Sequence, residues 1–102
     1  MSAIDNIDFE FLHNEAEKLI VTELGRQLDS YTRPICLCNE CVVDMAAMAL
    51  NNVKPLYRVS LLGSLYTATA MEESDYASSV REAVFNAIEK IRKHPSHDTV
   101  KQ

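Results

Sequence analysis

The chain has 102 residues, 25% of them charged and 47% hydrophobic, with a formal net charge of −5. This length fits one small domain, and the composition is ordinary for a soluble globular protein. The negative charge disfavours direct nucleic-acid binding, and no apolar run approaches the roughly 18 residues of a membrane span. No signal peptide is visible at the N-terminus, so we expect a cytoplasmic protein, without membrane contact, whose cysteines are reduced.

The charge is unevenly distributed along the sequence. Residues 1–50 hold nine acidic residues against three basic ones, whereas residues 51–102 hold six against seven. An anionic ligand is therefore expected to meet the second half of the chain.

Two helices are predicted in the first half. Apolar residues at helical spacing, with charged residues between them, indicate an amphipathic helix from about residue 8 to about residue 29. A second helix follows, with Asn39 as its expected cap and Glu40 in its first turn. It should end near Asn51, because the residue before a proline avoids helical angles and Lys54-Pro55 follows.

The second half combines a short extended segment with a long helix. The alternation from Leu56 to Leu62 predicts a strand, and this lone strand needs a partner, which pairing across a symmetric dimer can provide. The last helix should end at His94-Pro95 and start either at the Thr69-x-x-Glu72 capping box or at Ser74. Its apolar stripe consists of Tyr76, Val80, Ala83, Val84, Ala87, Ile88 and Ile91.

These elements predict a mainly α fold: a small helical domain of three to four helices with one short extended segment. We expect residues 1–102 to form a single domain, with a core from about residue 8 to about residue 98 and a loose C-terminal tail. A chain of this length buries only roughly 65% of its unfolded surface. We therefore expect a metal or a partner subunit to stabilise it, and we predict a homodimer.

All three cysteines lie within six residues, in the pattern Cys36-x-Cys38-x-x-Cys41. Clustered thiols are typical of metal or redox chemistry, and three thiolates are one ligand short of a closed tetrahedral zinc site. We predict a structural zinc, whose fourth ligand can be His13, His94, His97, Asp44, a water molecule or a group of a partner subunit. The alternatives are reduced thiols that pack a buried turn, or redox-regulatory thiols.

The segment after the second helix combines a rigid proline turn, an aromatic ring and two cations, in Lys54, Tyr57 and Arg58. Lysine and arginine can neutralise a phosphate, and a tyrosine can stack on a base. The alternative is a plain turn, with Tyr57 in the core and both cations in solvent. Arg81, within the last helix, is in the same way more often a surface residue than a ligand contact.

Three stretches together resemble the late competence development protein family, ComFB. They are Cys36-x-Cys38-x-x-Cys41-x-x-Asp44 leading into Ala47–Asn52, the Lys54-Pro55-Leu56-Tyr57 turn, and Ala87-Ile88-Glu89-x-Ile91-x-x-His94-Pro95-x-His97. Their order and spacing match the family from about residue 15 to about residue 98. The resemblance implies a small, mainly helical, dimeric cytoplasmic protein, and its cysteine-bearing branch is associated with zinc.

Cyanobacterial relatives with a similar Pro-Leu-Tyr turn, but without the cysteines, act as receptors for cyclic dinucleotides such as cyclic di-GMP. The resemblance therefore implies ligand contacts at Pro55, Leu56 and Tyr57, and by neighbourhood at Lys54 and Arg58. The ligand segment is predicted to run from Lys54 to Ser60, and Arg81 can converge on the same phosphates. The cysteine-bearing relatives often have Pro-Pro-Arg-Tyr at this turn, whereas here Leu56 replaces that arginine and Arg58 follows the tyrosine.

Two functions remain in competition. The first is a non-enzymatic signalling protein that binds a cyclic dinucleotide, cyclic di-GMP before cyclic di-AMP, and relays this to a protein effector. The second is a zinc-stabilised structural or adaptor dimer without a nucleotide ligand. An enzyme is not indicated, because the chain has no Ser/His/acid set, glycine-rich phosphate loop or suitably spaced acid pair.

Overall fold

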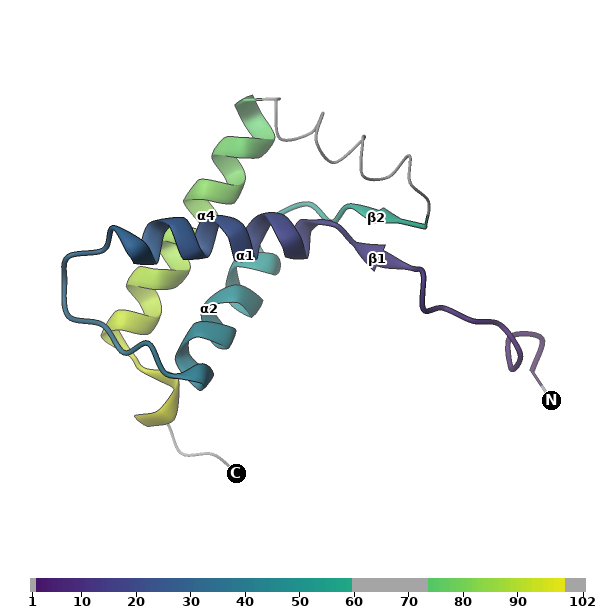
Figure 1. The fold of residues 1–102 in the computed structure, drawn as a ribbon, viewed down its shortest axis with the longest axis horizontal. Helices are drawn as coiled ribbons and strands as arrows, with labels where there is room; N and C mark the ends of the chain where they lie inside the picture. The colour runs from purple at the N-terminus through teal and green to yellow at the C-terminus, as the bar shows by residue number, and fades with distance from the viewer. Residues whose placement is uncertain (1, 60–73, 99–102) are drawn as a thin grey trace.

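Three helices form the body of the protein in a computed structural model that describes residues 2–59 and 74–98 (Figure 1). The helices are α1 (Ala16–Asp29), α2 (Asn39–Leu50) and α4 (Ser74–Lys93), and the short 3-10 helix η1 (Ser96–Asp98) follows α4. A two-stranded antiparallel sheet joins β1 (His13–Asn14) to β2 (Tyr57–Arg58). The predicted mainly α fold is confirmed.

The core lies where the apolar stripe of α4 packs against both other helices. The stripe was predicted correctly: all its members are buried except Tyr76, which is half-buried. From α1 and α2 the opposing core residues are Ile20, Leu24, Cys41, Met45 and Ala49. One cysteine of the cluster thus belongs to the core, which ties the geometry of the cluster to the packing of the helices.

The first helix begins later than predicted, at Ala16 rather than near residue 8. The side-chain oxygen of Asn14 explains the difference, because it accepts hydrogen bonds from the backbone N–H of Ala16 at 3.1 Å and of Leu56 at 2.8 Å. Asn14 is thus held in a strand while it satisfies an N–H of the first helical turn. Periodicity alone did not reveal this boundary.

The strand predicted after α2 finds its partner within the same chain. His13 pairs with Arg58 and Asn14 with Tyr57, and the N–H of Glu15 donates to the carbonyl of Leu56 at 2.8 Å. The predicted strand therefore has its partner in β1 of the same chain, and not in the copy across a dimer axis that the sequence also allowed. Only Tyr57–Arg58 form the strand. Leu56 and Val59, which were also predicted, lie outside it, while residues 60–62 and the Thr69-x-x-Glu72 capping box lie outside the described residues.

Residues 2–12, which we call the N-terminal arm, project away from the three helices at the β1 end of the molecule (Figure 1). Five apolar side chains of this arm are 48–65% exposed: Ile4, Ile7, Phe9, Phe11 and Leu12. At the other end of the described residues, η1 follows α4. Within the described residues, no helix is long and apolar enough to cross a membrane.

The connector between α1 and α2 is fixed to α4 through Glu89. The hydroxyl of Tyr31 donates to Glu89 at 2.6 Å, Arg92 lies 2.9 Å from the same carboxylate, and Arg33 lies 3.6 Å from it. The hydrogen bond from Arg92, followed by that from Tyr31, holds the pKa of Glu89 below its ordinary value. This network anchors the connector just before Cys36, so it helps to set where the cysteine cluster lies.

Replacing Asn14 by alanine is expected to destabilise the protein by about 1–3 kcal/mol, because the N–H of Leu56 loses its partner in a part-buried position. The matched control is Asn86→Ala, at an exposed position of α4 where alanine favours the helix. Urea unfolding followed by circular dichroism measures both variants. Equal stability of Asn14→Ala and the parent protein would show that Asn14 does not hold the sheet to α1.

Candidate functional site

The cysteine cluster is built around the N-terminus of α2. Cys36 and Cys38 lie on the connector, and Cys41 lies in the first turn of the helix. Cys38, not Asn39 as predicted, is the N-cap: its backbone is extended, and its sulfur accepts the N–H of Cys41 at 3.4 Å. The capping bond turns the Cys38 sulfur toward Cys41, while Cys41 itself is fully buried.

The fourth member of the cluster is His97, on η1. Its Nε2 lies 3.0 Å from the Sγ of Cys36, although the two residues are 61 positions apart in sequence. The Oγ of the buried Ser96 donates to Oδ2 of Asp44 at 2.6 Å, which fastens η1 to α2. Of the candidate fourth ligands, the structure therefore brings His97 to the sulfurs.

The four ligand atoms of Cys36, Cys38, Cys41 and His97 all lie within 4.8 Å of one another. In a tetrahedral site with bonds of about 2.0–2.3 Å, ligand atoms lie roughly 3.3–3.8 Å apart. Small side-chain adjustments therefore suffice to close a Cys3His site around a metal ion. The cysteines are free thiols, with no disulfide among them.

The electrostatics of the cluster favour a cation. The N–H of Cys41, directed at the Cys38 sulfur, holds the pKa of the Cys38 thiol below its ordinary value. For Cys36 the N–H of Cys38 acts in the same direction, but the neighbouring thiols and desolvation outweigh it and raise the pKa. Adjacent sulfurs resist carrying several negative charges together, and a bound metal ion removes that repulsion.

The other candidate ligands lie elsewhere. His13 is in β1, paired with Arg58. His94 lines the groove between α2 and α4, and Asp44 accepts the hydrogen bond from Ser96. Asp44 thus orients the segment that carries a ligand without being one of the four clustered residues.

The Lys54–Arg58 turn lies past the other end of α2 and is held in place by its backbone. The hydroxyl of Tyr76 donates to the carbonyl of Lys54 at 2.9 Å, and Leu56 bonds to both Asn14 and Glu15. The side chain of Leu56 is buried at 6% exposure, so it supports the turn from beneath, whereas Lys54 and Pro55 are exposed.

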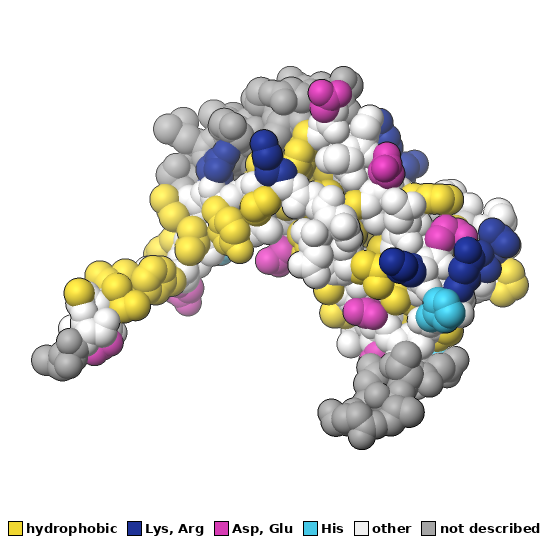
Figure 2. Space-filling view, turned by 180° about the vertical axis from the view of Figure 1, so that it is seen from behind, with side chains coloured by type: hydrophobic (Ala, Val, Ile, Leu, Met, Phe, Trp, Pro, Cys, Tyr) yellow, Lys and Arg dark blue, Asp and Glu magenta, His cyan; other side chains and the backbone are white. Residues whose placement is uncertain are grey.

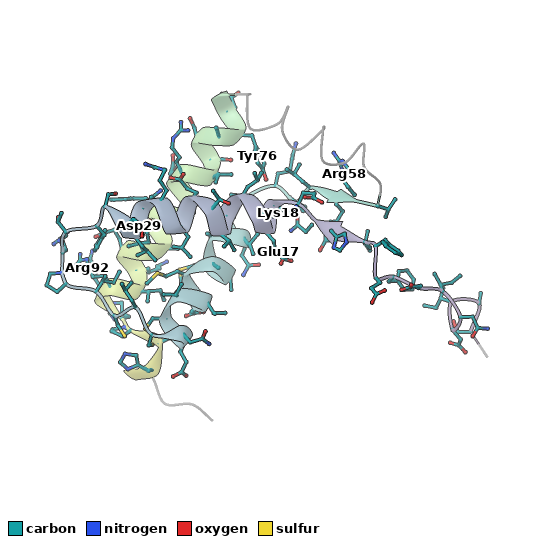
Figure 3. The ribbon with its side chains drawn as sticks, viewed as in Figure 1. Glu17, Lys18, Asp29, Arg58, Tyr76 and Arg92 are labelled. Carbon is teal, nitrogen blue, oxygen red and sulfur yellow. The ribbon has the colours of Figure 1, made fainter. Side chains whose placement is uncertain are left out.

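Tyr57 is 54% exposed, which contradicts the alternative in which it fills the core. Its side chain lines a pocket of about 440 Å³, together with Leu12, His13, Asn14, Glu15, Glu17 and Lys18. Figure 3 shows Arg58 on the strand beside this pocket, with Lys18 and Glu17 near the start of α1. The guanidinium of Arg58 donates to the carbonyl of Tyr57.

Arg81 lies on the exposed side of α4, where its guanidinium donates to Ser78. It lines a different pocket, shared with Arg26, Arg33 and Phe85. Arg81 and Tyr57 therefore face separate hollows of one chain. Ser60, the last residue of the predicted ligand segment, lies outside the described residues.

Comparison with known proteins settles the family. The family model of the late competence development protein ComFB matches residues 13–95. The chain belongs to this family. A solved structure of the late competence protein ComFB from Bacillus subtilis shares its fold, with a TM-score of 0.72 and 22% sequence identity over 89% of this chain and 99% of that one. A search of curated proteins gives no match.

The ComFB match ends at residue 95, two residues before His97, and begins at residue 13, after the N-terminal arm. Sequence reasoning had found three of the four clustered candidate ligands and had left the fourth open among several groups. A signal for His97 was present in its place just after the last helix, but only the fold distinguishes it from His94. The roles of Cys38 as helix cap and of Ser96 in fastening η1 were missed.

Proposed function

We propose that this ComFB-family protein is a small, non-enzymatic regulatory module of the cytoplasm, built on a structural zinc. In this proposal residues 8–98 form its single domain, and the module acts as a homodimer. It binds a cyclic dinucleotide, with cyclic di-GMP favoured, at the Lys54–Ser60 segment, and relays this to a protein effector.

The observation that carries the zinc part is the convergence of Cys36, Cys38, Cys41 and His97 within 4.8 Å. Three soft thiolates with one imidazole suit zinc, and a site with four protein ligands has no open position for catalysis. When bound, zinc would supply a cross-link between the start of α2 and the end of the chain. The binding free energy of such a site is folding free energy, which suits a domain of this size.

The ligand part rests on exposure and charge around the turn. Tyr57 presents an aromatic ring to solvent, and Lys54 and Arg58 flank it on a segment whose backbone is fixed. An exposed ring on a rigid strand can stack on a base, and the two cations can meet the phosphates of a cyclic dinucleotide. A two-fold dimer would present these groups twice to a ligand that is itself two-fold symmetric.

The second candidate is the zinc-stabilised adaptor without a nucleotide ligand, and two observations favour it. Glu15 and Glu17 line the pocket beside Tyr57, and acidic groups repel a phosphate. The guanidinium of Arg58 is also directed at a backbone carbonyl rather than outward. Ligand titration separates the two candidates.

Replacing His97 by alanine is expected to lower zinc affinity by at least about tenfold, because even the loss of an outer-shell partner has an effect of that size. Competition with a chromophoric chelator measures the affinity, and His94→Ala is the matched control, since His94 lies on the groove instead. The parent protein should hold one zinc per chain and melt at a lower temperature after chelation. Equal losses in both histidine variants would contradict the assigned ligand set.

Replacing both Lys54 and Arg58 by alanine is expected to weaken cyclic di-GMP binding about ten- to a hundredfold or more, since a lost charge-assisted hydrogen bond costs roughly 1.5–3 kcal/mol. Isothermal titration with cyclic di-GMP and cyclic di-AMP measures this. The control is Lys93→Ala, an exposed lysine near the end of α4. Unchanged affinity in the well-folded double variant would place the ligand site elsewhere. If the parent protein binds neither nucleotide, the second candidate function, the zinc-stabilised adaptor, would be favoured.

A further inference from the structure

A long hollow lies between α2 and α4. It consists of two adjoining cavities, of about 940 and 540 Å³, which share Met48, Lys90 and His94, and together we call them the α2–α4 groove. The described residues that line it belong to the two helices and to the segments directly after them. On α4 the lining extends from Asp75 to Lys93, which is about 27 Å along a helix axis. The groove is therefore elongated, as a docking site for a helix has to be.

The floor of the groove is apolar. Ala83 and Ala87, one turn apart on α4, leave room above them because their side chains are short. Met48 of α2 is half-buried in the lining of the same cavity, and the exposed Val43 and Ala47 extend the apolar surface. Helix axes approach each other to about 8–10 Å, depending on the side chains between them, so two alanines permit a close approach.

Most charged side chains of the groove are acidic. They are Glu40, Asp44, Asp75, Glu82, Glu89, Lys90 and Lys93. Five carboxylates therefore face two lysines. Glu89 is already paired with Arg92 at 2.9 Å, and without it four acids remain against the two lysines. The groove is expected to attract a cationic partner and to repel an acidic one.

The excess of acidic groups lies at one end of the groove. Asp75 and Glu82 line it toward the start of α4, where no lysine or arginine is among the described lining residues. At the other end, Glu40 and Asp44 of α2 are balanced by the two lysines near the end of α4. Figure 2 accordingly shows acidic, basic and hydrophobic side chains interspersed around a histidine. A partner helix should be most basic where it passes Asp75 and Glu82.

These charges disfavour an occupant from this chain. The N-terminal arm contains Asp5, Asp8 and Glu10, and residues 2–12 include no lysine or arginine. A second copy carries the same net charge of −5, and two grooves facing each other would bring acids against acids. The groove is instead complementary to a different, basic protein.

The groove also adjoins the supports of both candidate sites. Ser96 lines one end, and its hydrogen bond to α2 fastens η1, which carries His97. Asp75 lines the other end and precedes Tyr76, whose hydroxyl donates to the carbonyl of Lys54 at 2.9 Å. A partner in the groove would contact segments next to the cysteine cluster and next to the Lys54–Arg58 turn. This position suits the surface through which a regulatory protein meets its effector.

We propose that the α2–α4 groove is the docking surface for a basic amphipathic helix of the protein effector. The apolar face of that helix lies over Met48, Ala83 and Ala87, and its lysine or arginine side chains pair with Asp75 and Glu82. A helix of about 18 residues spans the lined length of α4. The inference rests on the proposed function, because it names the kind of partner to which the protein relays.

A display library of helical peptides of about 18 residues, with all surface positions randomised, tests the proposal. The protein is used as purified and without nucleotide. The enriched peptides are expected to carry an apolar stripe at helical spacing and an excess of lysine and arginine. In nitrogen-15 NMR titrations, an enriched peptide should shift the amide signals of Met48, Ala83 and Ala87. It should leave those of Val21 and Thr22, which are exposed on α1, unchanged.

A charge variant tests the complementarity. Asp75→Asn/Glu82→Lys is expected to weaken binding of the enriched peptide at least about tenfold, because a lysine then faces a basic helix. The matched control, Glu17→Lys/Asp29→Asn, changes the net charge equally through exposed residues of α1 and should weaken binding less than about threefold. Fluorescence anisotropy measures the affinities, and circular dichroism verifies that each variant is folded.

Enrichment of acidic or uncharged peptides, or no enrichment, would overturn the proposal. Shifts confined to another surface, or equal losses in the two variants, would overturn it as well. Titration with cyclic di-GMP separates this failure from that of the proposed function. Nucleotide binding without a groove peptide contradicts only the docking surface, whereas a groove peptide without nucleotide binding contradicts the nucleotide receptor and supports the docking surface.

Discussion

The packing of the α4 stripe against α1 and α2 is the contact on which the other features of the molecule depend. Val84 and Ile88 are fully buried in it, and they fix the direction in which α4 leaves the core. That direction carries η1 back over the start of α2, where the hydrogen bond between Ser96 and Asp44 holds it. The proximity of His97 to three cysteines from a distant part of the sequence is a consequence of this helix packing.

A metal ion bound at the cysteine cluster would in turn stabilise the packing that forms it. Cys41 is both a core residue and one of the four clustered candidate ligands, so a metal bound there would hold α2 from within the core and η1 from outside. The Lys54–Arg58 turn lies beyond the opposite end of α2, which is about 18 Å long. Direct electrostatic influence over that distance is largely screened at physiological salt, so a bound metal would reach the turn only through the position of α2.

The sequence was sufficient for features that depend on local periodicity and composition. The stripe on α4, the end of α2 near Asn51 and the candidate metal-ligating role of the cysteine run follow from spacing and from residue chemistry. The features that it did not predict depend on contacts between distant segments. Asn14 delays the start of α1 to Ala16 because Leu56, 42 residues away, supplies the second group that it binds.

The unpredicted features of the candidate metal site also depend on contacts beyond the local sequence. Cys38 displaced Asn39 as the cap because its sulfur can face both the helix N-terminus and the neighbouring thiols, whereas an isolated helix would favour asparagine. His97 was one of several open candidates, since the choice between it and His94 depends on the path of a three-residue turn after α4. Tyr57 lies on a strand that pairs with β1 along one edge. The side chain that packs inward is that of the preceding residue, Leu56, which leaves Tyr57 exposed.

X-ray absorption spectroscopy at the zinc edge is the measurement that decides whether the cluster holds a metal, because it reports the ligands around the metal in the folded protein. We expect one zinc with three sulfur ligands at about 2.3 Å and one nitrogen ligand at about 2.0–2.1 Å. A shell of oxygen and nitrogen ligands, or one with fewer than three sulfurs, would contradict the claim that the helix packing assembles a Cys3His metal centre.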